Sequence, residues 1–254
     1  MRTFRRVAMY LSLAFLGLQG CRLPGKPSIA DEVPRPEAVT SFDVLYRQNC
    51  SGCHGTDGQN GPATNLANPE YQALVDDPTL RQIISDGEKG TLMPAFGVSS
   101  GGNLTPAQIN SLVQGLRSRW NRNDIFSGQN PPPYKAGKSG DPRHGQQVYA
   151  IACARCHGAT AQQPGSAGSI LDDSFLALIS DQMIRTTILA GRPDLGHPDW
   201  RGDIPGRSLT DAEVTDVTAW IMAQRSPMPG QPYPDTNRTA ERPGESKAVA
   251  PAKP

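Results

Sequence analysis

Cys50-Ser51-Gly52-Cys53-His54 and Cys153-Ala154-Arg155-Cys156-His157 are two copies of one pattern, a pair of cysteines three positions apart with histidine directly after the second. Cysteines at this spacing fall on one turn of a helix, so both thiols can reach the same group. A single C-x-x-C pair is often a zinc site or a redox-active dithiol. Two copies of the pair, each followed directly by histidine, make a zinc site or a redox-active dithiol less favoured than a cofactor-attachment site.

C-x-x-C-H is the attachment pattern of c-type haem. The thiols bind the two vinyl groups of one porphyrin, and the histidine lies beneath the iron as its proximal ligand. We therefore predict two covalently bound haem c groups. Their thioethers involve Cys50, Cys53, Cys153 and Cys156, and their proximal iron ligands are His54 and His157.

The N-terminus predicts export and lipidation. Three arginines within the first six residues precede an apolar stretch, residues 9–18, that is too short to span a bilayer. It ends in Leu18-Gln19-Gly20-Cys21, which resembles the lipobox of bacterial lipoproteins, with acylation of Cys21. An ordinary secretory signal with a chance cysteine is the alternative. We expect a protein held by lipid on the periplasmic side of a bacterial membrane, inner or outer.

Composition agrees with this use of the cysteines. Of the five, one is the expected anchor and four belong to the motifs, so none is left for a disulfide. The formal charge of +1 becomes slightly negative once the arginine-rich signal is removed, which gives no indication of nucleic-acid binding. No Ser/His/Asp set, paired carboxylates or phosphate-binding loop is evident.

The motifs belong to an internal repeat. Cys50 corresponds to Cys153 at an offset of 103, and one extra residue in the second loop shifts later positions to 104. At that offset Met93 corresponds to His197.

Both repeats predict helices and no strands. Short helices over residues 43–49 and 145–152 lead into the motifs, and middle helices follow over 71–74 with 78–85 and over 175–178 with 181–190. The last helix of each repeat begins at a capping box, Thr105 with Gln108 and Thr210 with Glu213. No stretch alternates apolar and polar residues as a strand would.

The expected organisation has six parts. They are a signal peptide (1–20), an anchor and tether (21–40), a first helical domain (41–120), a Pro/Gly-rich linker (121–140), a second helical domain (141–225) and a disordered tail (226–254). The first and second repeats below are residues 41–120 and 141–225.

The pattern resembles the cytochrome c family, as a tandem of two small domains. The resemblance implies an all-α fold in which each domain wraps one haem, with a close crossing of its first and last helices, usually a glycine on an aromatic residue. Gly145 and Trp220 match this in the second repeat. In the first, Phe42 and Gly115 exchange the large and small positions, so we predict that Phe42 packs on Gly115.

The resemblance also implies a distal iron ligand in the loop before the last helix. In the first repeat this is Met93, 39 residues after His54, unless it only fills the core. The second repeat has His197 at that position, with Met183 or an open iron as alternatives. The family also orients the proximal histidine with a loop carbonyl, expected at Pro62 in the first repeat and at Pro164, Gly165 or Ser166 in the second. Arg192 and Trp200 are candidate donors to a haem propionate.

These observations predict a membrane-anchored dihaem electron carrier of a respiratory chain, with no catalytic residues. A bis-histidine haem lies below a His/Met haem in potential, other factors being equal, so electrons would pass from the second haem to the first. Redox proteins are the expected partners, with the carrier possible as a subunit of a larger complex. The alternatives are a haem enzyme, peroxidase-like or sulfur-oxidising, with a displaceable ligand at the second haem, and a passive scaffold subunit.

Overall fold

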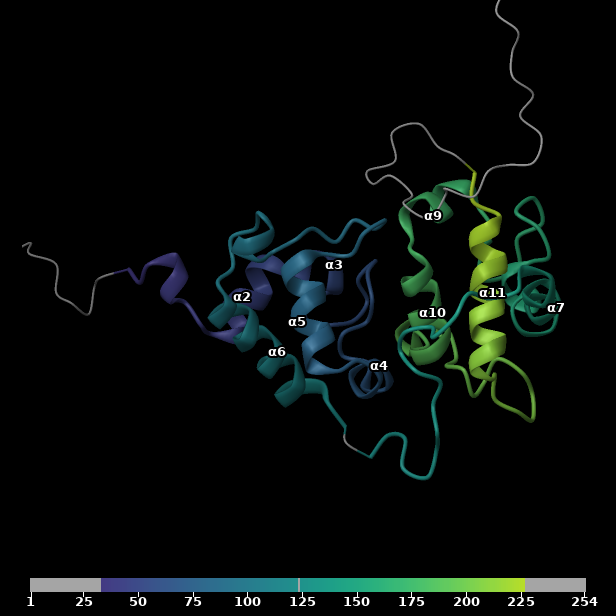
Figure 1. Cartoon of the computed structure of the whole chain (residues 1–254), viewed down its shortest axis with the longest axis horizontal. Coiled ribbons are helices and arrows are strands. Elements are labelled where there is room, and N and C mark those ends of the chain that lie inside the picture. Colours follow the sequence, from purple (N-terminus) through teal and green to yellow (C-terminus); the bar gives the residue numbers. More distant parts are fainter. Residues whose placement is uncertain (1–32, 123, 227–254) are drawn as a thin grey trace, which may run out of the picture. The chain divides into compact units, whose positions relative to one another are not determined.

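The computed structural model describes residues 33–122 and 124–226 (Figure 1). These residues form ten α-helices and three short 3-10 turns, with isolated bridges and no strand. The predicted all-α fold is therefore confirmed. The expected signal peptide, the anchor at Cys21 and the tail from residue 227 onward lie outside the described residues. Within the described residues, no helix combines the length and the apolar character needed to cross a bilayer.

In the first repeat, the helices begin within two residues of their predicted starts. Its elements are α2 (Phe42–Asn49), α3 (Ser51–His54), α4 (Pro69–Leu74), α5 (Asp77–Asp86), the turn η3 (Val98–Ser100) and α6 (Pro106–Trp120). The side chains of Asn68 and Asp76 accept hydrogen bonds from backbone N–H groups in the first turns of α4 and α5. A separate turn, η2 (Pro36–Ala38), belongs to the N-terminal unit of the chain.

The second repeat has the same order of elements. They are α7 (Pro142–Ala152), α8 (Ala154–His157), α9 (Asp173–Leu178), α10 (Asp181–Ala190), the turn η4 (Pro193–Leu195) and α11 (Asp211–Ala223). Helix α7 starts three residues before the predicted segment because Asp141 caps it and Pro142 occupies its first position.

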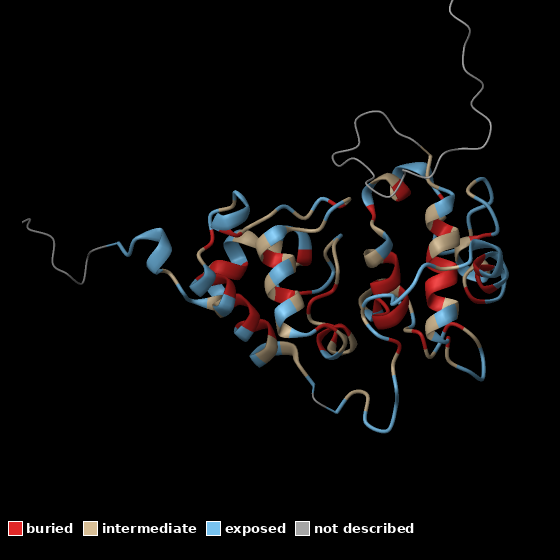
Figure 2. Cartoon of the chain, viewed as in Figure 1, coloured by how far each residue is buried: buried red, intermediate tan, exposed pale blue. Residues whose placement is uncertain are grey.

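The last helices form the centre of each repeat, where α6 contacts α2 and α5, and α11 contacts α7 and α10. Both predicted capping boxes are present. Val113 on α6 and Val214 and Val217 on α11 are completely buried, and Figure 2 shows the buried stripe along α11. Full burial of a side chain of this size contributes about 1.5–3 kcal/mol. Packing on these buried helices thus holds α2 and α7, the helices that lead into the two motifs, in place.

The crossing of first and last helices differs between the repeats as predicted. In the first, a Cβ on residue 115 would overlap the ring of Phe42. In the second, a Cβ on residue 145 would overlap the backbone carbonyl of Asp216 and approach Trp220. The predicted contact of Phe42 with Gly115 is confirmed, and the glycine permits close approach in both crossings.

Backbone hydrogen bonds confirm the register of the loops before the last helices. The N–H of Glu88 donates to the carbonyl of Met93 at 3.1 Å, and the N–H of Arg192 donates to the carbonyl of His197 at 3.0 Å. Both pairs are five residues apart, so Met93 and His197 occupy equivalent places.

The predicted linker contacts α10. Arg185 Nη2 donates to the carbonyl of Pro133 at 2.7 Å, and Gln182 Nε2 donates to the carbonyl of Tyr134 at 2.9 Å. These bonds satisfy linker carbonyls that would otherwise need water.

Candidate haem sites

Each motif forms one helical turn, as its spacing predicts. The N–H of His54 donates to the carbonyl of Cys50 at 3.0 Å, and that of His157 donates to the carbonyl of Cys153 at the same distance. In both turns the first cysteine is half-buried and the second is exposed. The first cysteine of each motif thus caps a short helix, and the second cysteine and the histidine lie on its last two positions.

Both proximal histidines are oriented by a backbone carbonyl. His54 Nδ1 lies 2.8 Å from the carbonyl oxygen of Thr64, and His157 Nδ1 lies 3.0 Å from that of Gly168. A carbonyl only accepts, so Nδ1 carries the proton and Nε2 is left as the metal-binding nitrogen.

The identity of these carbonyls corrects the sequence-based expectation. Pro62 was expected to orient His54, and one of residues 164–166 to orient His157. In both loops the carbonyl that accepts from the histidine lies two or more residues after the predicted position, because the loop first turns back over its own motif. A Cβ at Gly61, for example, would overlap the carbonyl of Cys53. Thr64 and Gly168 are nevertheless 104 apart, as the repeat register requires.

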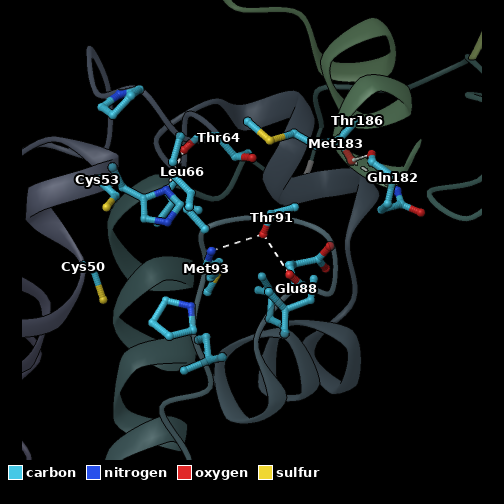
Figure 3. Close-up of a pocket in the computed structure, with 18 of the residues that line it drawn as sticks. Cys50, Cys53, Thr64, Leu66, Glu88, Thr91, Met93, Gln182, Met183 and Thr186 are labelled. Atoms are coloured by element: carbon cyan, nitrogen blue, oxygen red, sulfur yellow. Dashed lines mark hydrogen bonds between the residues drawn. The ribbon is translucent and has the colours of Figure 1, made fainter. Parts of the chain in front are cut away.

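A cavity of about 350 Å³ adjoins the first motif (Figure 3). Cys50, Cys53, His54 and Met93 all line it, and Leu66, Leu80 and Leu112 contribute apolar walls. Thus the structure brings together both thiols, the proximal histidine and the predicted distal methionine. An apolar cavity with a few polar groups suits a large flat cofactor.

Met93 is held in this cavity by its own loop. Its N–H donates to Thr91 Oγ1 at 3.1 Å, and Thr91 Oγ1 donates to the carbonyl of Glu88 at 2.9 Å. Gly87, which ends α5, has a φ of 71°, and a Cβ there would approach the backbone of Met93 and Pro94. The positive φ and the missing Cβ at Gly87 therefore allow the methionine loop to fold back beside the end of α5.

The second repeat and the linker also line the first cavity. Leu178 comes from α9, Gln182 and Met183 come from α10, and Tyr134 comes from the linker. Sequence reasoning placed none of these residues at the first motif, because only the packing of the repeats brings them to the cavity. Met183 was an alternative ligand for the second haem; the structure places it at the first cavity (Figure 3).

In the second repeat, His157 and His197 face one another. Their ring centroids are 5.9 Å apart, with 39° between the ring planes. Two imidazoles bound to opposite sides of one metal ion, each at about 2 Å, have centroids roughly 6 Å apart. His197 Nδ1 lies 2.6 Å from the carbonyl oxygen of Pro198, which leaves its Nε2 as the metal-binding nitrogen.

Burial determines the protonation of these groups. It raises the pKa of the Cys50 and Cys153 thiols to about 12, with smaller contributions from the neighbouring acidic groups. Burial also lowers the pKa of His54 and His197, which keeps both imidazoles in the neutral, metal-binding form.

Two further residues near the second motif are buried and polar. Trp200 Nε1 has no hydrogen-bond partner among the described residues, so it fits a carboxylate acceptor such as a haem propionate.

Burial, and then the charge of Asp199, raise the pKa of Asp203 to about 7. The charge of the Asp203 carboxylate in turn raises the pKa of Cys153. Arg192, the other candidate donor to a propionate, instead binds Asp194 and the backbone of the first repeat.

This donor set fits two haems: paired thiols on helical turns, histidines with free Nε2 atoms, and a facing methionine or histidine. Fold and donors define a tandem cytochrome c. The family model described as cytochrome c oxidase, cbb3-type, subunit III matches residues 37–114 and, again, residues 140–221. The chain therefore belongs to this family of cytochrome c domains, whose members bind haem c covalently and transfer electrons.

The chain is also similar to a solved structure from Kuenenia stuttgartiensis, the reducing HAO-like protein complex Kustc0457/Kustc0458. The two share 20% sequence identity, over 76% of this chain and 100% of the other, with a TM-score of 0.44.

Proposed function

We propose that this protein is a dihaem electron carrier with two unequal sites, anchored by lipid on the periplasmic side of a bacterial membrane and serving a respiratory chain. When bound, each haem supplies an iron that cycles between the ferrous and ferric states. His54 and Met93 would hold one iron, and His157 and His197 the other.

The facing imidazoles of His157 and His197 carry this proposal. Their centroid distance of 5.9 Å suits two ligands of one metal ion, and the equivalent position in the first repeat holds a methionine. A thioether ligand raises the potential of a haem relative to a second imidazole. Two sites with the same attachment and different distal ligands suit a relay between partners of different potential.

The N-terminal sequence supports the proposed location. Acylation of Cys21 would hold the chain on a membrane, because several acyl chains together give stable anchoring. Residues 22–40 would then separate the first repeat from the bilayer. The proposed partners are redox proteins that give electrons to this carrier or take them from it.

A spectrum of the full-length, lipidated protein tests this function. Intact mass should show two haems per chain, and the reduced protein should bind carbon monoxide at neither haem on mixing, because both irons already have two axial ligands. Rapid binding at the second haem would contradict the carrier and favour the enzyme alternative, in which His197 leaves the iron.

A further inference from the structure

Arg192 and Asp194 form a buried ion pair at the start of the His197 loop. Arg192 Nε donates to Asp194 Oδ1 at 2.9 Å and Nη2 donates to Oδ2 at 2.8 Å, a bidentate arrangement. The side chains are 10% and 1% exposed. Hydrogen bonds from Arg192 hold the pKa of Asp194 well below its ordinary value, so the pair is ionised at neutral pH.

The pair binds the loop that follows the first motif. Arg192 Nη1 donates to the carbonyl of Ala63 at 3.0 Å, and Nη2 donates to that of Gly61 at 2.9 Å. The N–H of Asn60 donates to Asp194 Oδ2 at 3.0 Å. Asn60 has a φ of 61°, a left-handed conformation that asparagine tolerates better than most residues. Three backbone groups of residues 60–63 are thus fixed by two side chains of the second repeat.

This same loop orients the proximal histidine of the first repeat. Thr64, whose carbonyl accepts from His54 Nδ1 at 2.8 Å, directly follows Ala63. A shift of the Ala63 carbonyl therefore moves the acceptor of His54. At its other end, Arg192 exchanges two backbone hydrogen bonds with His197, both at 3.0 Å. One residue thus connects the distal-ligand loop of the second site with the proximal-ligand loop of the first.

A lysine could not replace this arginine. The guanidinium uses three nitrogens toward one carboxylate and two carbonyls, in a planar geometry that an ammonium group lacks. Glu88 occupies the equivalent place in the first repeat, where its N–H donates to the Met93 carbonyl. The arrangement is therefore specific to the second repeat and does not follow from the duplication.

We propose that Arg192 and Asp194 are positioning residues for the first haem site: from the second repeat, they hold residues 60–64 so that the Thr64 carbonyl keeps its hydrogen bond with His54. The inference rests on the proposed function, in which His54 binds iron. A firm bond at Nδ1 makes the imidazole a more basic ligand. A more basic ligand favours ferric iron, so the pair lowers the potential of the first haem.

The test separates geometry from charge. The double variant Arg192→Gln/Asp194→Asn removes both charges together, so the potential of the first haem should rise through loss of orientation. Arg192→Lys keeps the charge and loses the planar contacts, so it should shift the potential in the same direction. Each variant should also change the electron paramagnetic resonance g-values of the first ferric haem.

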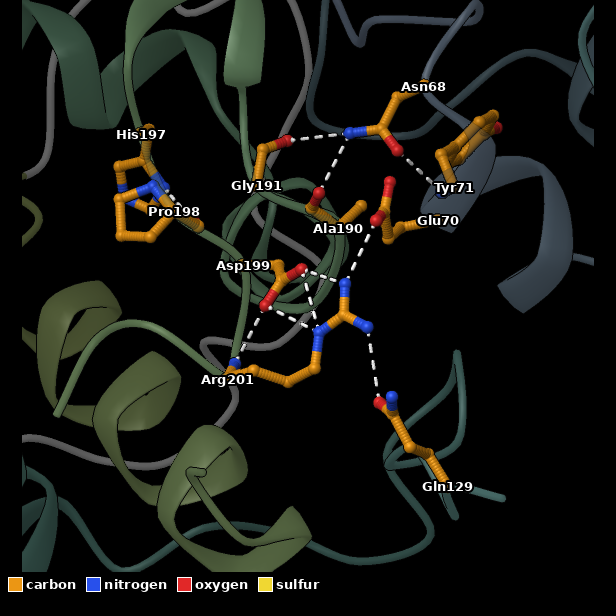
Figure 4. A network of polar contacts seen from close by, with 10 residues as sticks. All are labelled: Asn68, Glu70, Tyr71, Gln129, Ala190, Gly191, His197, Pro198, Asp199 and Arg201. Carbon is orange, nitrogen blue, oxygen red and sulfur yellow. Dashed lines mark hydrogen bonds and ion pairs between the residues drawn. The ribbon is translucent and has the colours of Figure 1, made fainter. Parts of the chain in front are cut away.

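Glu70→Gln is the matched control. Glu70 accepts from Arg201 Nη2 at 2.9 Å, another ion pair between the repeats, which also involves Asp199 and Gln129 but no backbone group of residues 60–64 (Figure 4). Its loss should leave the potential and g-values of the first haem unchanged. Asp194→Asn alone, the mildest change, keeps one acceptor oxygen for Arg192 and should give a smaller shift.

Three results would overturn the inference. They are a wild-type potential and spectrum in haem-loaded Arg192→Lys, no change in the double variant, or an equal shift in Glu70→Gln. A wild-type protein that carries no haem at Cys50 and Cys53 would overturn the proposed function as well. Intact mass of each variant distinguishes the two failures, since it reports whether both haems are attached.

Discussion

The loops over residues 88–96 and 192–200 share one backbone hydrogen bond, from the N–H of their first residue to the carbonyl five residues later, and carry different side chains. In one, the pairing joins Glu88 with Met93, and in the other it joins Arg192 with His197. The first loop turns its methionine toward the cavity beside the first motif. The second presents a histidine to His157 and also sends an arginine to the other repeat. The two repeats therefore share a scaffold, while two differences between them change the predicted metal ligand and create a link between the candidate sites.

Removing one haem-attachment site at a time should have the largest effect, because it isolates the two sites from each other. Cys50→Ala/Cys53→Ala should leave one covalent haem per chain, held by the second motif. Cys153→Ala/Cys156→Ala should leave the other, because the thiols of one motif cannot reach the second site. Intact mass counts the haems, and the spectrum of each variant should show one type of axial ligation only.

An identical spectrum from the two variants would show that the sites are equal. That result would contradict the difference between Met93 and His197 as iron ligands.

Substitutions at the two helix crossings should have effects of intermediate size, on the free energy of unfolding. Gly115→Ala and Gly145→Ala should each lower the free energy of unfolding of the haem-loaded protein by about 1–3 kcal/mol through overpacking. Phe42→Leu should partly rescue Gly115→Ala, because the added methyl group overlaps the Phe42 ring. Denaturant unfolding monitored by far-ultraviolet circular dichroism measures both effects.

Gly145→Ala should resist a similar rescue. Its added methyl group overlaps the backbone carbonyl of Asp216, which no side-chain substitution moves away. Trp220→Leu is the matched second change, and full recovery with it would contradict the packing of α7 on α11 described above.

The two haems should also differ in how their potentials depend on pH, an effect smaller than those of the variants above. Asp203 has a pKa of about 7, and its charge acts on Cys153 of the second motif. Above that pH the carboxyl ionises, and the added negative charge favours ferric iron. The potential of the second haem should therefore fall as pH rises from 6 to 8, on either side of that pKa.

Asp203→Asn should remove this slope and leave the first haem as it was. Redox titration at several pH values measures both. A slope that persists in the variant would assign the proton to another group near the second haem.

Much of this architecture could be predicted from the sequence because its signals are local. Capping boxes at Thr105 and Thr210 and the fixed spacing within each motif depend on neighbouring residues alone. The exchange of Phe42 and Gly115 was predictable because the two repeats could be compared with each other. The register that pairs Met93 with His197 was predictable for the same reason.

Contacts between the repeats were not predictable in this way. Arg192 was interpreted as a propionate donor because its partners, the carbonyls of Gly61 and Ala63, are backbone groups without a sequence signature. Met183 belongs to the second repeat and was therefore considered for the second iron. The packing of the two repeats, which the sequence does not reveal, instead turns it toward the first cavity. The carbonyl of Thr64 was missed because the path of a loop is not fixed by its composition.

A redox titration of the haem-loaded protein with and without His197→Met tests the two unequal sites most directly. The wild-type protein should titrate in two separate one-electron steps, the lower one belonging to the His157/His197 haem. His197→Met should raise that lower step toward the upper one, because a thioether replaces an imidazole, and should leave the upper step nearly in place. An unchanged titration curve in the variant would contradict the account.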